Sequence, residues 1–154
     1  MIEGQFIVGI EGLKETGFIR SEIFTGDLKM PISVEKDQYD HFAHHLIIKD
    51  GDKKVATGRL ILKDGEFLIG RIAVLKEARG MQIGDLVVRM LMDRAFSMGA
   101  KEVFVHALIS LQSFYEKVGF KAVSEPFVEA TLEHIAMNIQ KKDINTACGG
   151  CNGC

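Results

Sequence analysis

Residues 72–84 read IAVLKEARGMQIG and join an apolar strand to an amphipathic helix through a short glycine-containing loop. The first turn of a helix has backbone N–H groups without intrahelical partners and a partial positive charge, so a phosphate group docks there readily. Glycines let the backbone approach phosphate oxygens because no Cβ intervenes, and Arg79 adds a cation beside them. The stretch therefore predicts a phosphate-binding turn, and the simpler alternative is an unoccupied helix cap.

Three known phosphate-binding patterns compete for this loop. The Walker pattern ends in Gly-Lys-Ser/Thr, whereas the loop ends in Ile83-Gly84-Asp85. The dinucleotide fingerprint G-x-G-x-x-G requires three glycines that the loop does not supply. The coenzyme A pattern, Arg/Gln-x-x-Gly-x-Gly/Ala, is the nearest, because residues 79–84 read RGMQIG, with Gln82 at a glycine position of the pattern.

Hydrophobic periodicity on both sides of the loop predicts the remaining elements. An amphipathic helix is expected over residues 83–98, ended by Gly99 in the left-handed region. Apolar runs separated by Asp-Gly turns predict an antiparallel meander over residues 43–49, 54–62 and 66–75. Further strands are expected over residues 5–10, 102–108, 120–123 and 130–139, helices over 13–24 and 111–118, and an irregular stretch over 26–39. This order predicts the α/β (α+β) class, a mixed sheet with helices on its faces.

Composition limits the classes of function. The chain has 154 residues, enough for one domain, and its 47% apolar and 26% charged residues are typical of a globular protein. The formal net charge of -2 does not favour nucleic acid as a partner, and no basic amphipathic stretch favours a membrane surface. Neither a signal peptide nor a spanning apolar run is recognisable, so a cytoplasmic location is expected.

Two motifs together identify a family. The chain carries RIAV at residues 71–74, EARG at 77–80, IG at 83–84 and FYEKVGF at 114–120. Through them, residues 66–120 resemble the GNAT superfamily of acyl-CoA-dependent N-acyltransferases. Residues 40–46 and 127–137 are similar to a bacterial subgroup of mostly unassigned small-molecule N-acetyltransferases. The resemblance implies a single GNAT domain over residues 1–142, with a strongly bent mixed sheet whose central parallel strands splay to form a cofactor slot.

The cofactor that the resemblance implies is acetyl-CoA, which brings coenzyme A to the loop. In that family the strand before the loop pairs its backbone with the pantetheine arm, and loop amides hold the pyrophosphate. The positions that correspond to the arm are Ile72, Ala73 and Val74. The positions that correspond to the pyrophosphate site are Arg79, Gly80, Met81, Gln82, Ile83 and Gly84, with Asp85 close by.

Acylation of an amine by a thioester requires a neutral amine and a proton for the leaving thiolate. By resemblance Tyr115 supplies this proton, since a phenol with a pKa near ~10 stays protonated at pH 7; a packing role is its alternative. His106, on the strand expected beside the thioester, is the candidate base, against an ordinary strand histidine or proton transfer through water. Glu129 and His134 are candidates for lining the acceptor pocket, and Glu129 is otherwise a solvated carboxylate.

Two departures from the family pattern motivate an alternative function. Gln82 either crowds the phosphate or bonds to it through its side-chain amide. Leu108 stands where many family members carry Asn or Gln, so Ser110 or Ser113 is a candidate to replace that contact. A non-catalytic acyl-CoA-binding sensor is therefore the first alternative.

The histidines near residue 44 are candidate metal ligands. His41 and His45 have a spacing that suits zinc on one face of a helix. The run that follows Phe42 reads as the entry to a strand, however, where His44 and His45 point to opposite faces. This geometry disfavours a metal site there.

The tail over residues 143–154 ends in CGGCNGC and lies outside the resemblance. Cys148, Cys151 and Cys154 are spaced so that three thiolates could converge on a soft metal ion with a fourth ligand from elsewhere. A C-x-x-C pair also suits thiol–disulfide exchange, and a flexible extension is the third reading. A metal- or redox-sensing module acting through this tail is the second alternative function.

The predicted function is transfer of an acetyl group from acetyl-CoA to the primary amine of a small molecule, by direct attack, with Tyr115 as the general acid. A small-molecule amine is the expected partner, nucleic acid and membrane are not, and a homodimer is a candidate assembly. The sequence carries no motif that is diagnostic of the acceptor amine.

Overall fold

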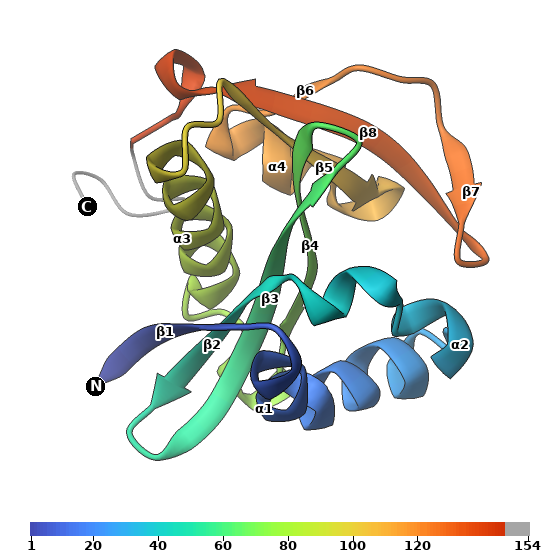
Figure 1. Ribbon diagram of the computed structural model, residues 1–154. Helices are drawn as coiled ribbons and strands as arrows, with labels where there is room; N and C mark the ends of the chain where they lie inside the picture. The colour runs from blue at the N-terminus through green and yellow to red at the C-terminus, as the bar shows by residue number, and fades with distance from the viewer. Residues whose placement is uncertain (147–154) are drawn as a thin grey trace.

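The strands form one mixed sheet whose two halves separate in the middle. A computed structural model describes residues 1–146, and the strand order is β1-β2-β3-β4-β5-β8-β6, with β7 paired to β8 (Figure 1). The strands are β1 Ile2–Val8, β2 His44–Asp50, β3 Lys53–Lys63, β4 Glu66–Val74, β5 Glu102–Leu108, β6 Lys121–Ala122, β7 Phe127–Glu129 and β8 Leu132–Gln140. The helices are α1 Ile10–Arg20, α2 Ile32–Glu35, α3 Ile83–Ser97 and α4 Gln112–Val118, with a π-helical turn η1 Ser21–Asp27 and a 3-10 turn η2 Gln38–His41. The predicted mixed α/β fold with flanking helices is confirmed.

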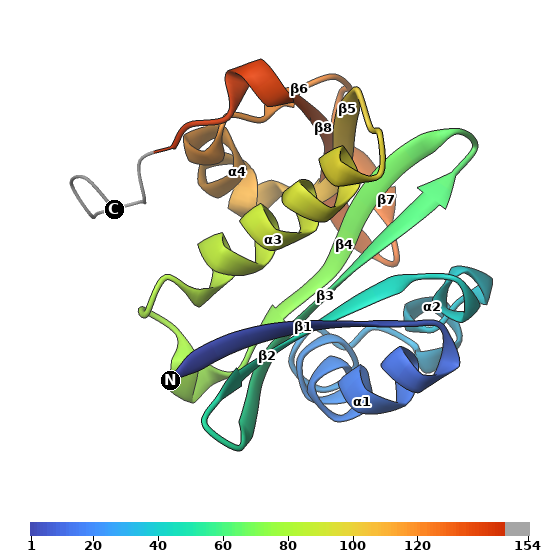
Figure 2. The same cartoon turned by 60° about the vertical axis from the view of Figure 1, so that its left-hand side comes forward.

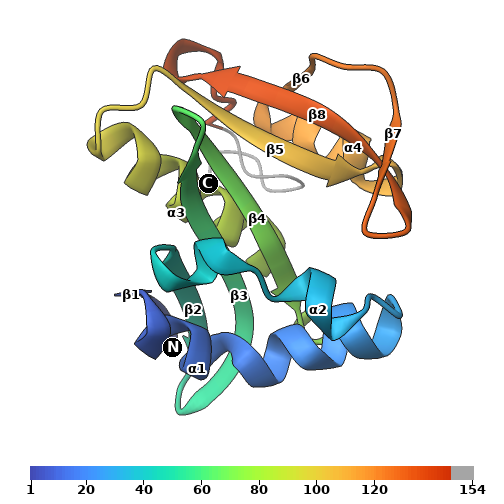
Figure 3. The ribbon, with the colours of Figure 1, turned by 45° about the vertical axis from the view of Figure 1, so that its right-hand side comes forward.

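The central parallel pair, β4 and β5, separates after a short contact. Their pairing covers Phe67–Ile69 against Val103–Val105, whereas β4 continues to Val74 and β5 to Leu108. Figure 3 shows the two strands diverging from their common start. Beyond the paired part, β4 has backbone N–H and C=O groups on this side that a neighbouring strand does not satisfy, so a ligand with amide groups can pair with them.

Helices cover both faces of the sheet (Figure 2). On one face, Leu46 of β2 shares the main hydrophobic core with Val87 and Leu91 of α3. On the other face, α1 approaches so closely that a Cβ on Gly12 would stand 2.6 Å from the ring of His45. Alternation along β2 thus directs neighbouring side chains into two different layers.

A β-bulge interrupts the pairing of β3 with β4. Thr57 pairs with Ala73 and Arg59 with Gly70, so two residues of β4 stand opposite Gly58 alone. One of the two, Arg71, has φ 48°, in the left-handed region that a side chain disfavours. Bulges of this kind re-aim side chains next to functional sites.

The N-terminal half of the chain departs from its predicted elements in detail. The expected helix over residues 13–24 begins earlier, as α1, and its last part is the π-helical turn η1. The expected irregular stretch over residues 26–39 contains the single turn of α2 and the start of η2. Both short turns lie in a segment that packs against β4 and lines the site described below.

The expected single strand over residues 130–139 is wrong at its start, because this part of the chain forms the β7–β8 hairpin. Its turn residues, Ala130 and Thr131, have φ 52° and 70°. Hairpin turns with two left-handed residues normally use Gly, Asn or Asp, so the sequence gives no turn signal here.

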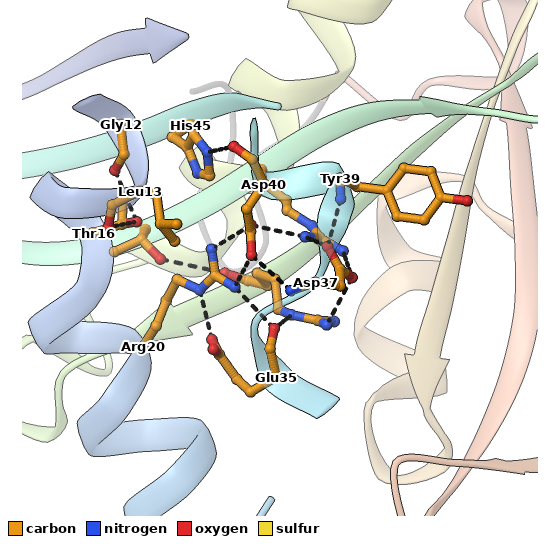
Figure 4. A network of polar contacts seen from close by, with 12 residues as sticks. Gly12, Leu13, Thr16, Arg20, Glu35, Asp37, Tyr39, Asp40 and His45 are labelled. Carbon is orange, nitrogen blue, oxygen red and sulfur yellow. Dashed lines mark hydrogen bonds and ion pairs between the residues drawn. The ribbon is translucent and has the colours of Figure 1, made fainter. Parts of the chain in front are cut away.

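A chain of buried charges ties the N-terminal segment to the sheet. Arg20 of α1 lies between Glu35 of α2 and Asp40 of η2 (Figure 4), and all three are at most 1% exposed. Asp40 also accepts a hydrogen bond from Nη1 of Arg59 in β3 at 2.8 Å. Burial opposes ionisation of Asp40, but the hydrogen bond and charge of Arg20, with Arg59 beside it, hold the pKa of this carboxyl well below its usual range.

His45 adds a neutral member to this cluster. Its Nε2 lies 2.9 Å from the backbone oxygen of Asp40; because a carbonyl oxygen only accepts, Nε2 carries the proton and donates. Burial lowers the pKa of His45, although the bond to Asp40 opposes this shift. Its Nδ1 has no hydrogen-bond partner within residues 1–146.

Acid is expected to destabilise the protein through His45. The unfolded chain binds a proton at this residue near a pKa of ~6.5, whereas the folded chain keeps the ring neutral to lower pH. The stability that His45 contributes is therefore fully present above about pH 6.5 and declines as the pH falls below that value. Urea unfolding should show a larger loss of the free energy of unfolding between about pH 7.5 and about pH 5.5 for the wild type than for His45→Gln.

His41→Gln, at an exposed histidine, is the matched control and should keep the wild-type difference. If His45→Gln kept it too, the acid sensitivity would have to arise elsewhere, for instance at His44, where burial also lowers the pKa.

Thr131→Gly is expected to raise the free energy of unfolding by about 1 kcal/mol. A β-branched residue in the left-handed region is strained by roughly 1–2 kcal/mol, and glycine offsets part of the gain through its entropy in the unfolded state. Urea unfolding measures the change, with Thr131→Ala as the control that keeps a Cβ. An equal gain in the alanine variant would contradict backbone strain as the cause.

Candidate active site

Two cavities open where β4 and β5 separate. The larger, called the groove here, has a volume of about 990 Å³ and follows β4 to the start of α3. The smaller, called the small cavity, has about 240 Å³ and is lined by β3, β4, β5, β7 and β8. The residues that line both are Phe24, Leu28, Ile72, Leu108, Leu111 and Tyr115. The groove and the small cavity therefore meet around these six side chains.

The groove is lined by nine of the ten residues predicted to bind a cofactor. These are Ile72, Ala73, Val74, Arg79, Gly80, Gln82, Ile83, Gly84 and Asp85. The tenth, Met81, is exposed and does not line it. The predicted loop and strand thus surround one continuous space.

The start of α3 faces this space with an open first turn. No side chain caps the helix, so its first backbone N–H groups lack intrahelical partners. Gln82 at the cap has φ 59° and Gly80 has φ 84°, two left-handed positions that turn the loop around the groove. At Gly84 a Cβ would come no nearer than 3.7 Å to Phe114, so packing within the protein does not require glycine there, but a Cβ would occupy space beside the helix start.

Charges around the helix start favour an anion. Arg79 donates from Nε to the backbone oxygen of Val74 at 3.1 Å, which fixes its guanidinium across the loop. Asp85 accepts from Nε of Arg89 at 2.7 Å, so its negative charge is balanced. Lys117 also lines the groove. Open amides, a helix dipole and fixed cations suit a diphosphate, and the unpaired edge of β4 suits an extended amide-containing arm.

Tyr115 stands at the junction of the two cavities. It is 4% exposed and is held by edge-on contacts with Phe114 and Phe120, whose ring centroids lie 5.1 and 5.6 Å away. Burial raises the pKa of the phenol well above its ordinary value. The Tyr115 hydroxyl makes no hydrogen bond to another of the described residues.

His106 of β5 and Glu129 of β7 form a pair in the small cavity. His106 Nδ1 and Glu129 Oε1 are 3.0 Å apart. The hydrogen bond from His106 lowers the pKa of Glu129, and burial opposes this shift without reversing it. An ionised carboxylate only accepts hydrogen bonds, so Nδ1 donates and Nε2 of the neutral ring keeps a lone pair. The strand places the ring edge-on to Phe127, 5.3 Å between centroids.

His134 of β8 lines the same cavity. Its Nδ1 lies 2.8 Å from the backbone oxygen of Leu132, and its ring stacks on Phe127 at 6.1 Å. The structure therefore brings together Tyr115, His106, Glu129 and His134, which come from α4, β5, β7 and β8.

Further polar residues, which no sequence motif indicates, line the small cavity. These are Asp37, Tyr39, Arg59 and Arg71. The available signal was an arginine in each of two apolar strands, β3 and β4, since an arginine there must find buried partners.

Leu108 lines both cavities, and Ser110 lines the groove beside it. Ser113, the other residue considered as a replacement for the missing polar contact, does not line either cavity.

The part of the chain that the structure describes contains no group of three His, Cys, Asp or Glu side chains arranged to hold a metal ion. The predicted thiolate ligands Cys148, Cys151 and Cys154 lie outside the described residues. Among the helices of residues 1–146, none has the length and apolar character needed to cross a membrane.

Comparisons with known proteins agree with this geometry. Residues 29–141 match the model of the acetyltransferase (GNAT) domain family. The chain is 32% identical over 128 residues to the uncharacterized N-acetyltransferase YjcF of Bacillus subtilis (strain 168). This alignment covers 82% of this chain and 91% of YjcF. The crystal structure of Escherichia coli ElaA has a TM-score of 0.80 at 25% identity, over 91% of this chain and 100% of that one. An acyl-CoA N-acyltransferase from Pseudomonas aeruginosa has a TM-score of 0.78 at 25% identity, over 90% and 99%.

The family model covers most of the chain, and the sheet, the open helix start and the groove have the arrangement that the sequence resemblance implied. The chain belongs to the GNAT acetyltransferase family, and it is an acyltransferase that uses an acyl-coenzyme A.

Proposed function

We propose that the protein transfers the acetyl group of acetyl-CoA to the primary amine of a small molecule, by direct attack of the amine. The observation that carries this proposal is the meeting of the groove and the small cavity at Tyr115. A proton donor thereby stands where a ligand in the groove and a ligand in the small cavity would touch. Acetyl-CoA, when bound, supplies an acyl group that is activated as a thioester.

The groove residues hold and aim the cofactor in this proposal. The first amides of α3 and the Arg79 guanidinium bind the diphosphate, and the free edge of β4 at residues 72–74 binds the arm. The backbone of Gln82 is in the left-handed region, and the residue lines the groove. Binding at two separated points fixes the direction of the ligand, and such positioning lowers the barrier of the reaction.

Tyr115 holds the proton that leaves with sulfur. A buried phenol whose pKa is raised stays protonated at neutral pH. No described residue competes for its hydroxyl proton, so Oη is free to pass that proton to the sulfur as the carbon–sulfur bond breaks.

His106 accepts the proton that the amine loses as the carbon–nitrogen bond forms. Glu129 fixes the tautomer, since Nδ1–H points to its carboxylate and leaves the Nε2 lone pair for the amine. Glu129 is thus a positioning residue in this scheme. His134 lines the pocket from the next strand.

The proposed catalytic domain spans residues 1–142, with residues 143–154 as a separate tail. Asn145 donates from its backbone N–H to the oxygen of Val118 at 2.8 Å and from Nδ2 to the oxygen of Lys117 at 3.0 Å. The chain therefore stays attached to the protein as far as Asn145, through bonds to the end of α4, the helix that bears Tyr115.

Tyr115→Phe is expected to lower kcat by ~10²–10³-fold while the affinity for acetyl-CoA stays within about twofold of the wild type, because a general acid contributes in this range and the ring still fills its site. Release of the coenzyme A thiol with a panel of amines measures kcat, and calorimetric titration measures affinity.

Tyr39→Phe removes the other tyrosine hydroxyl of the small cavity and is the matched control. Unchanged turnover in Tyr115→Phe would remove the proposed acid. Tight acetyl-CoA binding by a wild type that turns over no amine would favour the acyl-CoA sensor instead.

His106→Gln is expected to lower kcat by ~10²-fold and to abolish the acid limb of the profile of kcat/KM against pH, because the base that protonation would inactivate is gone. Glu129→Gln should lower kcat less and keep that limb, since it retains the histidine but holds its ring less firmly. A profile for His106→Gln with the wild-type acid limb would assign the limb to another group.

A further inference from the structure

Three guanidinium groups and three carboxylates form a cluster beside the small cavity, and the guanidinium groups differ in how closely carboxylates contact them. Arg20 binds Glu35 and Asp40. Arg59 binds Asp40 at 2.8 Å and takes both oxygens of Asp37, at 2.7 and 2.9 Å. All three carboxylates are thus engaged before the last guanidinium, Arg71, is counted.

Arg71 is the guanidinium with the weakest compensation. Its contact with a carboxylate is 3.4 Å, from Nη2 to Asp37. Its other bonds go to neutral backbone oxygens, of Glu35 at 2.9 Å and Val34 at 3.3 Å. Its Nη1 has no hydrogen-bond partner among the residues that the structure describes. A guanidinium group in this state has room for an anion.

The position of Arg71 directs it to the small cavity. Its side chain is 19% exposed and lines that cavity. The bulge opposite Gly58 holds its backbone at φ 48°, which is strained for a residue with a side chain. Burial lowers the pKa of Arg71, and repulsion from Arg59 and Arg20 lowers it further. The attraction of Asp37 and Glu35 opposes this shift without reversing it.

The same cavity also bears a charge of the other sign. Glu129 lies there with His106, the pair assigned above to the reacting amine. The remaining cation that lines the cavity, Lys63, is engaged over the ring of Tyr39 at 5.3 Å. The volume of about 240 Å³ lies below the ~300–1,000 Å³ of pockets for drug-sized ligands, so the acceptor is small.

We propose that the acceptor is a small amino acid or a similar aminocarboxylate, whose carboxylate binds Arg71 while its amine faces His106. The Nη1 of Arg71 has two N–H donors for a carboxylate, and charge-assisted bonds of this kind are among the strongest in proteins. This inference rests on the proposed function, because it names the substrate class of that same site.

The test compares matched acceptors on the wild-type enzyme. Small amino acids (glycine, alanine, serine and threonine) are each paired with their carboxamide and with the amine that lacks the carboxyl group. We expect kcat/KM, from release of the coenzyme A thiol, to be at least ~10²-fold higher for an amino acid than for its carboxamide, as a charge-assisted hydrogen bond implies. Aminomethylphosphonate, compared with glycine, distinguishes a carboxylate from a phosphonate as the anion.

Arg71→Gln should reduce the ratio of kcat/KM between amino acid and carboxamide to near one, and Arg71→Lys should keep part of it. Loss of the bonds to Val34 and Glu35 could unfold part of the variant enzyme. The ratio of kcat/KM between the two acceptors does not depend on the fraction of folded enzyme, so such unfolding would not imitate the expected change. Lys63→Gln removes a different cation of the cavity and should keep the wild-type ratio.

Equal turnover of amino acids and their carboxamides by the wild type would overturn this inference and leave the proposed acetyl transfer standing. A preference for the phosphonate over glycine would overturn the carboxylate. Intact binding of acetyl-CoA without turnover of any amine would overturn the proposed function, and the inference with it.

Discussion

Backbone pairing between β4 and β5 stops after residues 67–69, and the functional part of the molecule lies where it stops. An inner strand of a sheet normally pairs with its neighbours along both edges. One gap here is bordered by the free edge of β4, the start of α3 and the end of β5. Backbone N–H and C=O groups that would pair within a continuous sheet are therefore available to a ligand. The two cavities and the tyrosine between them are consequences of that separation.

The bulge in β4 supports this separation from the other side. Gly58 lies opposite it, and a Cβ there would come within 2.7 Å of Leu91 and 2.8 Å of Val87. α3 therefore presses against the sheet at the level where β4 bends. The same irregularity turns Arg71 toward the small cavity, so one local departure from strand geometry serves the bend of the sheet and the polarity of the pocket.

Sequence reasoning reached the half of the site that is local in the chain. The loop over residues 79–85 and Tyr115 belong to continuous motifs, and the order of strands and helices follows from periodicity. The other half depends on contacts between distant residues, as when Arg20 meets Asp40 and Arg59 meets Asp37, and no spacing in the sequence encodes such contacts. The β7–β8 turn was missed because residues 130–131 adopt left-handed backbone without the residue types that usually signal it.

The buried ion pairs also decide how the small cavity exchanges its contents. Its wall over residues 28–40 is attached to α1 and β3 through Arg20 and Asp40, and swinging that wall outward would break these buried ion pairs. Breaking one such pair costs about 3–5 kcal/mol, which corresponds to an open population of roughly one molecule in a hundred or fewer. The wall therefore stays closed in nearly all molecules, and the small cavity keeps one shape for the ligand that binds there.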